Sequence, residues 1–182
     1  MTLKKVSVVG AALLLITVGF LAGRFAQPAF KVSAGGLTGS PTVDFNDPRQ
    51  VVGLGHNVFT AYVVRYQGTT TGQERGPETQ FLVRVLKTLK GNLKGIVTVN
   101  QRGGYDRVSN ELILFQGEPL LSPGSNYLFI TANRDRPDGQ RWHTALTSGA
   151  HRLTNEEHGR QVEAQYAKAV NEEIRTWNSP KN

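Results

Sequence analysis

An alternation of apolar and polar residues over positions 79–89 constrains the fold of this chain more than any other feature of its sequence. One face of an extended segment here takes Phe81, Val83 and Val85, and the other takes Gln80, Leu82 and Arg84. A period of two residues is typical of a β-strand with one buried face. Runs of β-branched and aromatic residues, separated by Gly, Pro, Asn and Asp, predict further strands at 58–66, 96–101, 111–115, 126–131 and 141–146.

Turn residues between 79–89 and 96–101 predict that these two strands pair with each other. Lys90-Gly91-Asn92 and Lys94-Gly95 supply the residues that tight connections favour. The sequence Arg102-Gly103-Gly104-Tyr105 is expected to break the strand pattern after 96–101.

A single helix is expected near the carboxy-terminal end, over 155–177. Thr154 and Glu157 have the spacing of a capping box, in which each side chain satisfies a backbone amide at the helix start. Apolar residues then recur at helical spacing and predict a stripe that docks on the sheet, formed by Val162, Tyr166, Val170, Ile174 and Trp177.

The amino-terminal segment predicts a membrane anchor. Residues 6–23 form an uncharged run of 18 residues after Lys4 and Lys5. A helix of that length rises about 27 Å, which is nearly the thickness of a hydrocarbon core. The run is longer than the apolar region of a cleavable signal peptide, so an uncleaved signal anchor over 1–32 is expected, with residues 6–23 in the lipid bilayer. The alternative is secretion after cleavage near Ala34.

The rest of the chain divides into a linker and one domain. Residues 33–50 are rich in Gly, Ser and Pro and bury little apolar area, so they are expected to form a flexible linker. Residues 51–182 are expected to be extracytoplasmic, because a short segment before the anchor favours export of the larger part after it. The expected location is the cell membrane, which the chain crosses once.

The charge of the chain is unevenly distributed. Its net charge is +7, from 21 basic and 14 acidic residues. Four basic residues and no acidic one lie in 1–34, which leaves a net charge of only +3 for 35–182. No nucleic acid is therefore expected as a partner. The absence of cysteine excludes thiol nucleophiles and disulfides, and the absence of an Asn-x-Ser/Thr sequon favours a bacterial envelope protein.

Several stretches resemble a pattern of small exported bacterial domains. They are FLVRVLKTLKG (81–91), VTVNQ (97–101) with Gly103-Gly104, GEPLL (117–121) and PGSNYLF (123–129). Such domains are similar to the OB-fold barrel of netrin modules and tissue inhibitors of metalloproteinases. Over about residues 50–147 the resemblance implies a mainly β fold, a small antiparallel Greek-key barrel. Those inhibitors place an amino-terminal cysteine on the enzyme's zinc, so their mode of inhibition and their functional residues do not carry over to this chain.

Local signatures of catalysis and metal binding are missing from the sequence. The four histidines, at positions 56, 143, 151 and 158, have no His-Glu-x-x-His spacing, and no Gly-x-Ser-x-Gly motif occurs. A noncatalytic protein without metal or cofactor is therefore expected. The alternative is a cell-envelope hydrolase with a dispersed site, assembled from His56, His143 and the loop carboxylates Asp106, Glu111 and Glu118.

A group of cations between positions 84 and 107 is the candidate ligand site. Its members are Arg84, Lys87, Lys90, Lys94, Arg102 and Arg107, with Tyr105 as a stacking or hydrogen-bonding group. On a small barrel such residues would form a face for an envelope polyanion or a protein partner. Two alternatives stay open: a solvated hairpin whose lysines protect a strand edge, and an interaction module whose carboxy-terminal helix docks on another protein.

Overall fold

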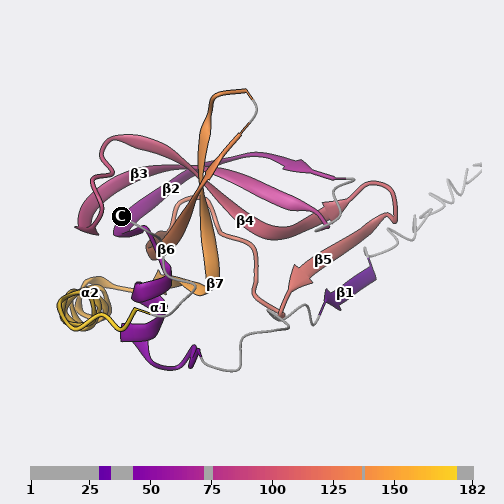
Figure 1. Cartoon of the computed structure of the whole chain (residues 1–182). Coiled ribbons are helices and arrows are strands. Elements are labelled where there is room, and N and C mark those ends of the chain that lie inside the picture. Colours follow the sequence, from indigo (N-terminus) through magenta and orange to yellow (C-terminus); the bar gives the residue numbers. More distant parts are fainter. Residues whose placement is uncertain (1–28, 34–42, 72–75, 137, 176–182) are drawn as a thin grey trace, which may run out of the picture.

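The computed structural model describes residues 29–33, 43–71, 76–136 and 138–175, and within them it contains one sheet of seven strands and two helices (Figure 1). The strands are β1 (Ala29–Ser33), β2 (Asn57–Thr70), β3 (Glu78–Lys90), β4 (Ile96–Asp106), β5 (Glu111–Phe115), β6 (Asn126–Asp135) and β7 (Arg141–Leu153). The helices are α1 (Pro48–Leu54) and α2 (Glu156–Asn171).

Five of the strands close into a barrel. The sheet order is β1-β5-β4-β3-β2-β6-β7, and β4 also pairs with β7. This closing pair is parallel and places Val99 opposite His143, whereas the other four pairs of the ring are antiparallel. The expectation of a mainly β barrel with a carboxy-terminal helix is therefore confirmed.

The predicted pairing of the strands around 79–89 and 96–101 is confirmed. β3 and β4 are antiparallel neighbours, with Arg84 opposite Ile96 near one end and Glu78 opposite Gly103 near the other. β5 then continues the sheet beside the far end of β4 and carries β1 on its other edge (Figure 1).

The predicted break at 102–105 is wrong, because β4 continues through these residues to Asp106. Gly103 and Gly104 have φ angles of 102° and 145°, which glycine adopts more readily than other residues. A β-carbon on Gly104 would lie only 2.3 Å from Oγ1 of Thr79. The two glycines therefore let the strand stay paired where neighbouring strands leave no room for a side chain.

The barrel interior is filled by aromatic and branched side chains. Phe59, Phe81 and Phe129 come from three different strands and are at most 2% exposed, and the ring centroids of Phe59 and Phe129 are 5.4 Å apart. The predicted alternation holds for Phe81, which is buried, and for Arg84, which is exposed. It fails for Gln80, which is only 7% exposed because other polar side chains cover it.

A second apolar cluster lies between the barrel wall and the two helices, whose positions Figure 1 shows. Val162, Tyr166 and Ala169 of α2 pack in one cluster with Val58 of β2 and Leu128 of β6. Val162, Tyr166 and Val170 of the predicted stripe thus face the chain's own barrel, whereas Ile174 lies beyond the end of α2 and is 39% exposed. Trp177 lies outside the described residues.

Helix α2 differs from the prediction at both ends. Its N-cap is Asn155, whose side chain accepts a hydrogen bond from the backbone N–H of His158, so the capping residue is one position later than Thr154. The helix ends at Asn171, and the chain then turns so that the N–H of Ile174 donates to the carbonyl of Arg49 at 3.0 Å.

Helix α1 begins inside the range expected to be a linker. Asp47 caps it by accepting a hydrogen bond from the N–H of Arg49, and Pro48 occupies the first turn. Val51 and Val52 are at most 1% exposed, and Phe45 packs against the same cluster. The folded domain therefore starts before position 51, and 34–42 of the expected linker lie outside the described residues.

The expected membrane helix at 6–23 also lies outside the described residues, so its presence stays a prediction. Neither helix in the described part of the chain is long and apolar enough to cross a membrane. Strand β1 crosses the expected boundary between the anchor and the linker, with 29–32 in the range of the anchor and Ser33 in that of the linker, and it pairs in parallel with β5.

Candidate functional site

Two of the predicted ligand-binding lysines hold the helices to the barrel. Lys87 of β3 forms an ion pair with Glu163 of α2. Lys90 is largely buried, and its Nζ donates to the carbonyl of Val52 at 2.8 Å and to Oε2 of Glu173 at 2.5 Å. Burial alone would raise the pKa of Glu173, but hydrogen bonds from Lys90 and Arg175 outweigh it and hold that pKa below its usual range.

The other predicted residues do not gather in one place. Arg84 lies beside Ile96, at one end of β4, whereas Tyr105 and Arg107 lie at its other end. Arg102 lies between them, with its guanidinium carbon 3.6 Å from the centroid of the Phe115 ring. The predicted cluster therefore separates into a group on β3 and a group near the turn between β4 and β5.

Arg84 belongs to an exposed wall that β2, β3 and β4 form together. Residues opposite each other on neighbouring strands point to the same side of a sheet. One such row runs from Tyr62 to Arg84 to Ile96, and the next runs from Arg65 to Leu82 to Thr98. We call these six residues the outer face.

Arg65 reaches the outer face through an irregularity in β2. A register shift lies between Val63, which is buried in the barrel, and Arg65, which is opposite Leu82. Without the shift, position 65 would share the inward side of position 63. Sequence reasoning missed Arg65 for this reason, because simple alternation assigns it to the interior and no turn residue marks the bulge.

The cations of the outer face have no acidic partner in the described part of the chain. Neither Arg65 nor Arg84 forms an ion pair there. The guanidinium carbon of Arg84 lies 6.0 Å from the centroid of the Tyr62 ring, and Ile96 is 59% exposed. The face therefore presents positive charge beside aromatic and apolar surface, which suits an anionic ligand with an apolar or sugar component.

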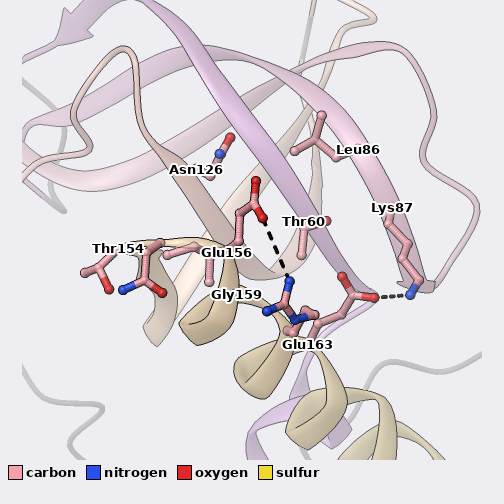
Figure 2. Close-up of a pocket in the computed structure, with 11 residues that line it drawn as sticks. Thr60, Leu86, Lys87, Asn126, Thr154, Glu156, Gly159 and Glu163 are labelled. Carbon is pink, nitrogen blue, oxygen red and sulfur yellow. Dashed lines mark hydrogen bonds and ion pairs between the residues drawn. The ribbon is translucent and has the colours of Figure 1, made fainter.

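A groove of 510 Å³ adjoins the outer face at its β2–β3 side (Figure 2). Leu86 and Lys87 of β3 and Thr60 of β2 line one side, and the first turns of α2 line the other. Lys87 and Glu163 meet across it, as Figure 2 shows. Because its cations pair with its own acids, the groove has mixed charge and is less suited to a polyanion than the outer face.

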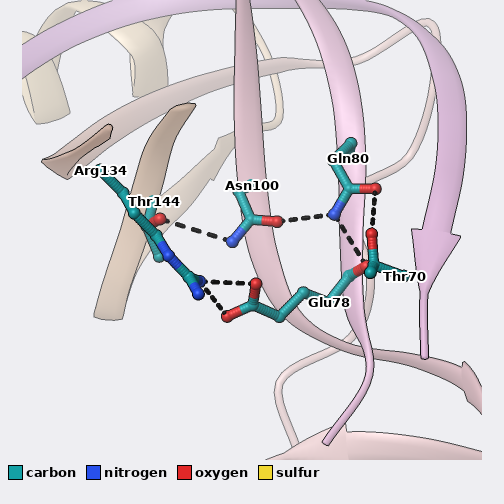
Figure 3. Close-up of polar contacts among 6 residues, drawn as sticks. All are labelled: Thr70, Glu78, Gln80, Asn100, Arg134 and Thr144. Atoms are coloured by element: carbon teal, nitrogen blue, oxygen red, sulfur yellow. Dashed lines mark hydrogen bonds and ion pairs between the residues drawn. The ribbon is translucent and has the colours of Figure 1, made fainter. Parts of the chain in front are cut away.

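A buried polar network lies further along the same strands (Figure 3). It joins Thr70 of β2, Gln80 of β3, Asn100 of β4 and Thr144 of β7. Nε2 of Gln80 donates to Oδ1 of Asn100 at 2.8 Å, and Nδ2 of Asn100 donates to Oγ1 of Thr144 at 3.4 Å. The side-chain oxygen and nitrogen of Gln80 and of Asn100 each have a hydrogen-bond partner within the chain. The network therefore holds the barrel together and offers no group to a ligand.

Two of the four histidines come together at one end of the barrel. Nδ1 of His56 accepts a hydrogen bond from the backbone N–H of Asn133 at 3.2 Å, and Nδ1 of His143 lies 3.1 Å from Oδ1 of the same residue. Burial lowers the pKa of both imidazoles, and the charge of Arg141 lowers them further. Neither histidine has a hydrogen bond to a carboxylate in the described residues.

The carboxylates of the alternative hydrolase site lie elsewhere. Asp106 and Glu111 are opposite each other at the tip of β4 and β5. Glu118 accepts a hydrogen bond from the N–H of Ser148 and lines a 390 Å³ cavity together with His151. In the described residues no group of histidines and carboxylates is arranged to hold a metal ion.

Comparisons with known proteins assign the chain to no family. No protein-family model matches the sequence, and no curated protein matches it.

Proposed function

We propose that this chain is a noncatalytic, membrane-tethered extracytoplasmic domain that binds an anionic polymer of the cell envelope on its outer face. The observation that carries the proposal is the pair of exposed arginines, Arg65 and Arg84, in adjacent rows of one β-sheet wall without an acidic partner among the described residues. Unpaired cations on a rigid strand face attract phosphate groups without losing an internal ion pair.

The order of the barrel strands supports an OB-like assignment. Numbered along the chain, the five ring strands follow the order 1-2-3-5-4, with a parallel contact between the third and the fifth. This order is similar to that of OB-fold barrels, which bind oligonucleotides and oligosaccharides on the face of the second and third strands. Here those strands are β3 and β4, which contribute four of the six outer-face residues.

The position of the histidines supports binding over hydrolysis. A general base needs a reacting group within hydrogen-bond reach and a partner that orients it. His56 and His143 both contact Asn133, whereas Asp106, Glu111 and Glu118 make their described contacts with other groups.

The pairing of β1 supports a retained anchor over a cleaved signal. Cleavage near Ala34 would remove Ala29–Ser33 and leave one edge of β5 without a partner strand. An uncleaved chain keeps this strand and connects the domain directly to the apolar run at 6–23.

The proposal is tested with poly(glycerol phosphate), which has the backbone chemistry of teichoic acids, and with the full chain in detergent micelles. We expect the dissociation constant to rise steeply with salt. The R65S/R84S variant should reduce the slope of log K against log salt by about 1.4, because each phosphate that is no longer neutralised accounts for roughly 0.7. R107S/K168S is the matched control and should keep the wild-type slope. Both side chains are exposed, and they lie away from the outer face, Arg107 just beyond the far end of β4 from Ile96 and Lys168 on α2.

Two results would overturn the polymer assignment. One is binding that is absent or insensitive to salt. The other is a loss of affinity in the control variant as large as that in R65S/R84S. The length of the polymer is measured after long incubation, and its shortening would instead favour the hydrolase.

A further inference from the structure

The turn between β4 and β5 exposes an apolar side chain to solvent. Val108 is 83% exposed, more than any other large hydrophobic residue that the structure describes, and Tyr105 is 39% exposed. Hydrogen bonds within the turn nevertheless fix its conformation. The N–H of Val108 donates to Oδ1 of Asp106 at 2.9 Å, and the Tyr105 hydroxyl donates to the side chain of Asn110. We call residues 105–110 the β4–β5 tip.

Strand β1 enters the fold at this tip. Its parallel register places Ala29 opposite Glu111, the first residue of β5, and Ser33 opposite Phe115, the last (Figure 1). The first residue of β1, Ala29, therefore lies beside the tip, and β1 runs away from the tip toward Ser33.

The covalent chain limits how far the tip can lie from the expected membrane segment. Six residue steps separate Gly23, at the end of the apolar run, from Ala29. At most about 3.6 Å per residue, this length spans no more than about 22 Å. A bilayer that holds residues 6–23 thus keeps Ala29, and with it the β4–β5 tip, close to its surface.

The charge of the tip decides what kind of contact forms. It carries the cation of Arg107 but also the carboxylates of Asp106 and, next to it, Glu111. Attraction to anionic headgroups is therefore not its driving force. Valine and tyrosine instead suit the boundary between headgroups and acyl chains, where an apolar side chain leaves water and a tyrosine keeps its hydroxyl in a polar layer.

We infer that the β4–β5 tip is a second membrane contact, in which Val108 enters the lipid interface and orients the barrel on the bilayer. The inference rests on the membrane tether of the proposed function. The tether keeps the tip at high local concentration near the surface, so that one exposed valine is enough to select an orientation. The outer face extends along β4 toward its other end, at Ile96, and is then held away from the membrane, where it meets envelope polymers.

The absence of cysteine allows a direct test, because a single introduced cysteine labels one site. The full chain carrying V108C is labelled with bimane and reconstituted into phosphatidylcholine vesicles that contain a nitroxide lipid. N92C is the matched control, an exposed position in the turn between β3 and β4, at the opposite end of β4. We expect the V108C label to shift its emission to the blue and to lose at least half of its fluorescence to the lipid quencher, and the N92C label to stay in water.

Flotation of the vesicles at alkaline pH and high salt tests the membrane tether separately from the contact of the β4–β5 tip. Chains that float while V108C remains as accessible to aqueous iodide as N92C overturn the tip contact and leave the tether intact. Equal quenching of both labels overturns it as well, because the whole domain then lies on the bilayer. Chains that fail to float overturn the tether and the tip contact together.

A substitution at Val108 gives a second readout. With the label moved to S109C, V108D should abolish lipid quenching without changing the thermal unfolding midpoint, because the Val108 side chain is 83% exposed. Undiminished quenching in V108D would contradict the insertion of this side chain.

Discussion

Arg134 of β6 reaches across to β3, where its Nη1 donates to both carboxylate oxygens of Glu78 at 2.7 and 2.6 Å. The Glu78 side chain is only 5% exposed, whereas that of Arg134 is 37% exposed. Figure 3 shows this pair beside the amide network of Gln80 and Asn100. A buried carboxylate on one strand is thus neutralised by a half-exposed cation from a strand that is not its neighbour in the sheet.

Removing Arg134 should destabilise the fold. R134A leaves the Glu78 carboxylate buried without its partner, which costs about 1–3 kcal/mol of unfolding free energy after allowance for the partial exposure of the arginine. Urea unfolding measures the change. The double variant R134A/E78Q should recover part of the loss, because a neutral amide is less costly to bury. A double variant no more stable than R134A would show that the charge of Glu78 is not the cause.

Gly104 should tolerate alanine poorly. Its φ of 145° is unfavourable for other residues, and a β-carbon would also lie 2.3 Å from Oγ1 of Thr79 and 2.7 Å from Cγ2 of Thr69. G104A should therefore cost about 2–4 kcal/mol, as backbone strain and crowding combine. G95A is the control, because Gly95 has a φ of 70° with open space around it. It should cost only about 1 kcal/mol. Equal losses in thermal or urea unfolding would mean that crowding at Gly104 is relieved by movement of the threonines.

Stability should fall as the pH drops below 7, in part through His151. Burial lowers the pKa of this imidazole, whose Nε2 lies 2.7 Å from the Tyr166 hydroxyl. Because the unfolded chain then takes up a proton at a higher pH than the folded one, the stabilising contribution is present above about pH 6.5 and is lost as the pH falls toward the folded pKa. His56 and His143 contribute in the same direction.

The substitution H151F separates this contribution from the others. The variant loses the hydrogen bond to Tyr166 and is less stable at every pH, but its unfolding free energy should decline less between pH 7 and pH 5 than that of the wild type. Urea titrations at pH 7, 6 and 5 provide the comparison. A decline as steep as in the wild type would assign the acid sensitivity to other groups.

Substitutions at Lys90 and Arg84 should have opposite effects, with the first lowering stability and the second weakening ligand binding. K90M removes the hydrogen bonds to Val52 and Glu173 that tie α1 and the segment just after α2 to β3, at a cost of about 1–3 kcal/mol, but should leave polymer affinity unchanged. R84S should change stability by less than about 0.5 kcal/mol and weaken polymer binding. Binding titrations and urea unfolding on both variants decide the matter. A tenfold loss of affinity in K90M would place Lys90 in the ligand site, as its sequence position alone suggests.

Local patterns predicted strands β2 to β7 and helix α2, because each depends on neighbouring residues, but they predicted neither β1 nor α1. The period of two around Phe81 and the helical spacing around Tyr166 are visible in the sequence itself. The residues at which these elements begin and end were harder to predict. Asn155 rather than Thr154 caps α2. β4 continues through Gly103, where the neighbouring strand leaves no room for a side chain, and no local pattern indicates this crowding.

The candidate site was harder to predict because charge alone does not show which cations are free. Lys87 and Lys90 look the same as Arg84 in the sequence, but residues more than 70 positions away supply their acidic partners. Arg65 reaches the outer face only through the register shift after Val63. Both effects are set by tertiary structure, so a linear cluster of basic residues overstates the size of the site.

The parallel contact between β4 and β7 also determines when the barrel can form. Asn100 and Thr144, which meet at this contact, are 44 residues apart along the chain. Loop closure over such a distance costs entropy before any pairing compensates for it, so β-rich domains of this kind fold over milliseconds to seconds. As a ribosome or a translocation channel releases the chain from its amino-terminal end, β2, β3 and β4 emerge as an open ribbon. The ring closes only when β7 has followed and paired with β4. Pairing of this last strand is therefore the step that completes the native fold.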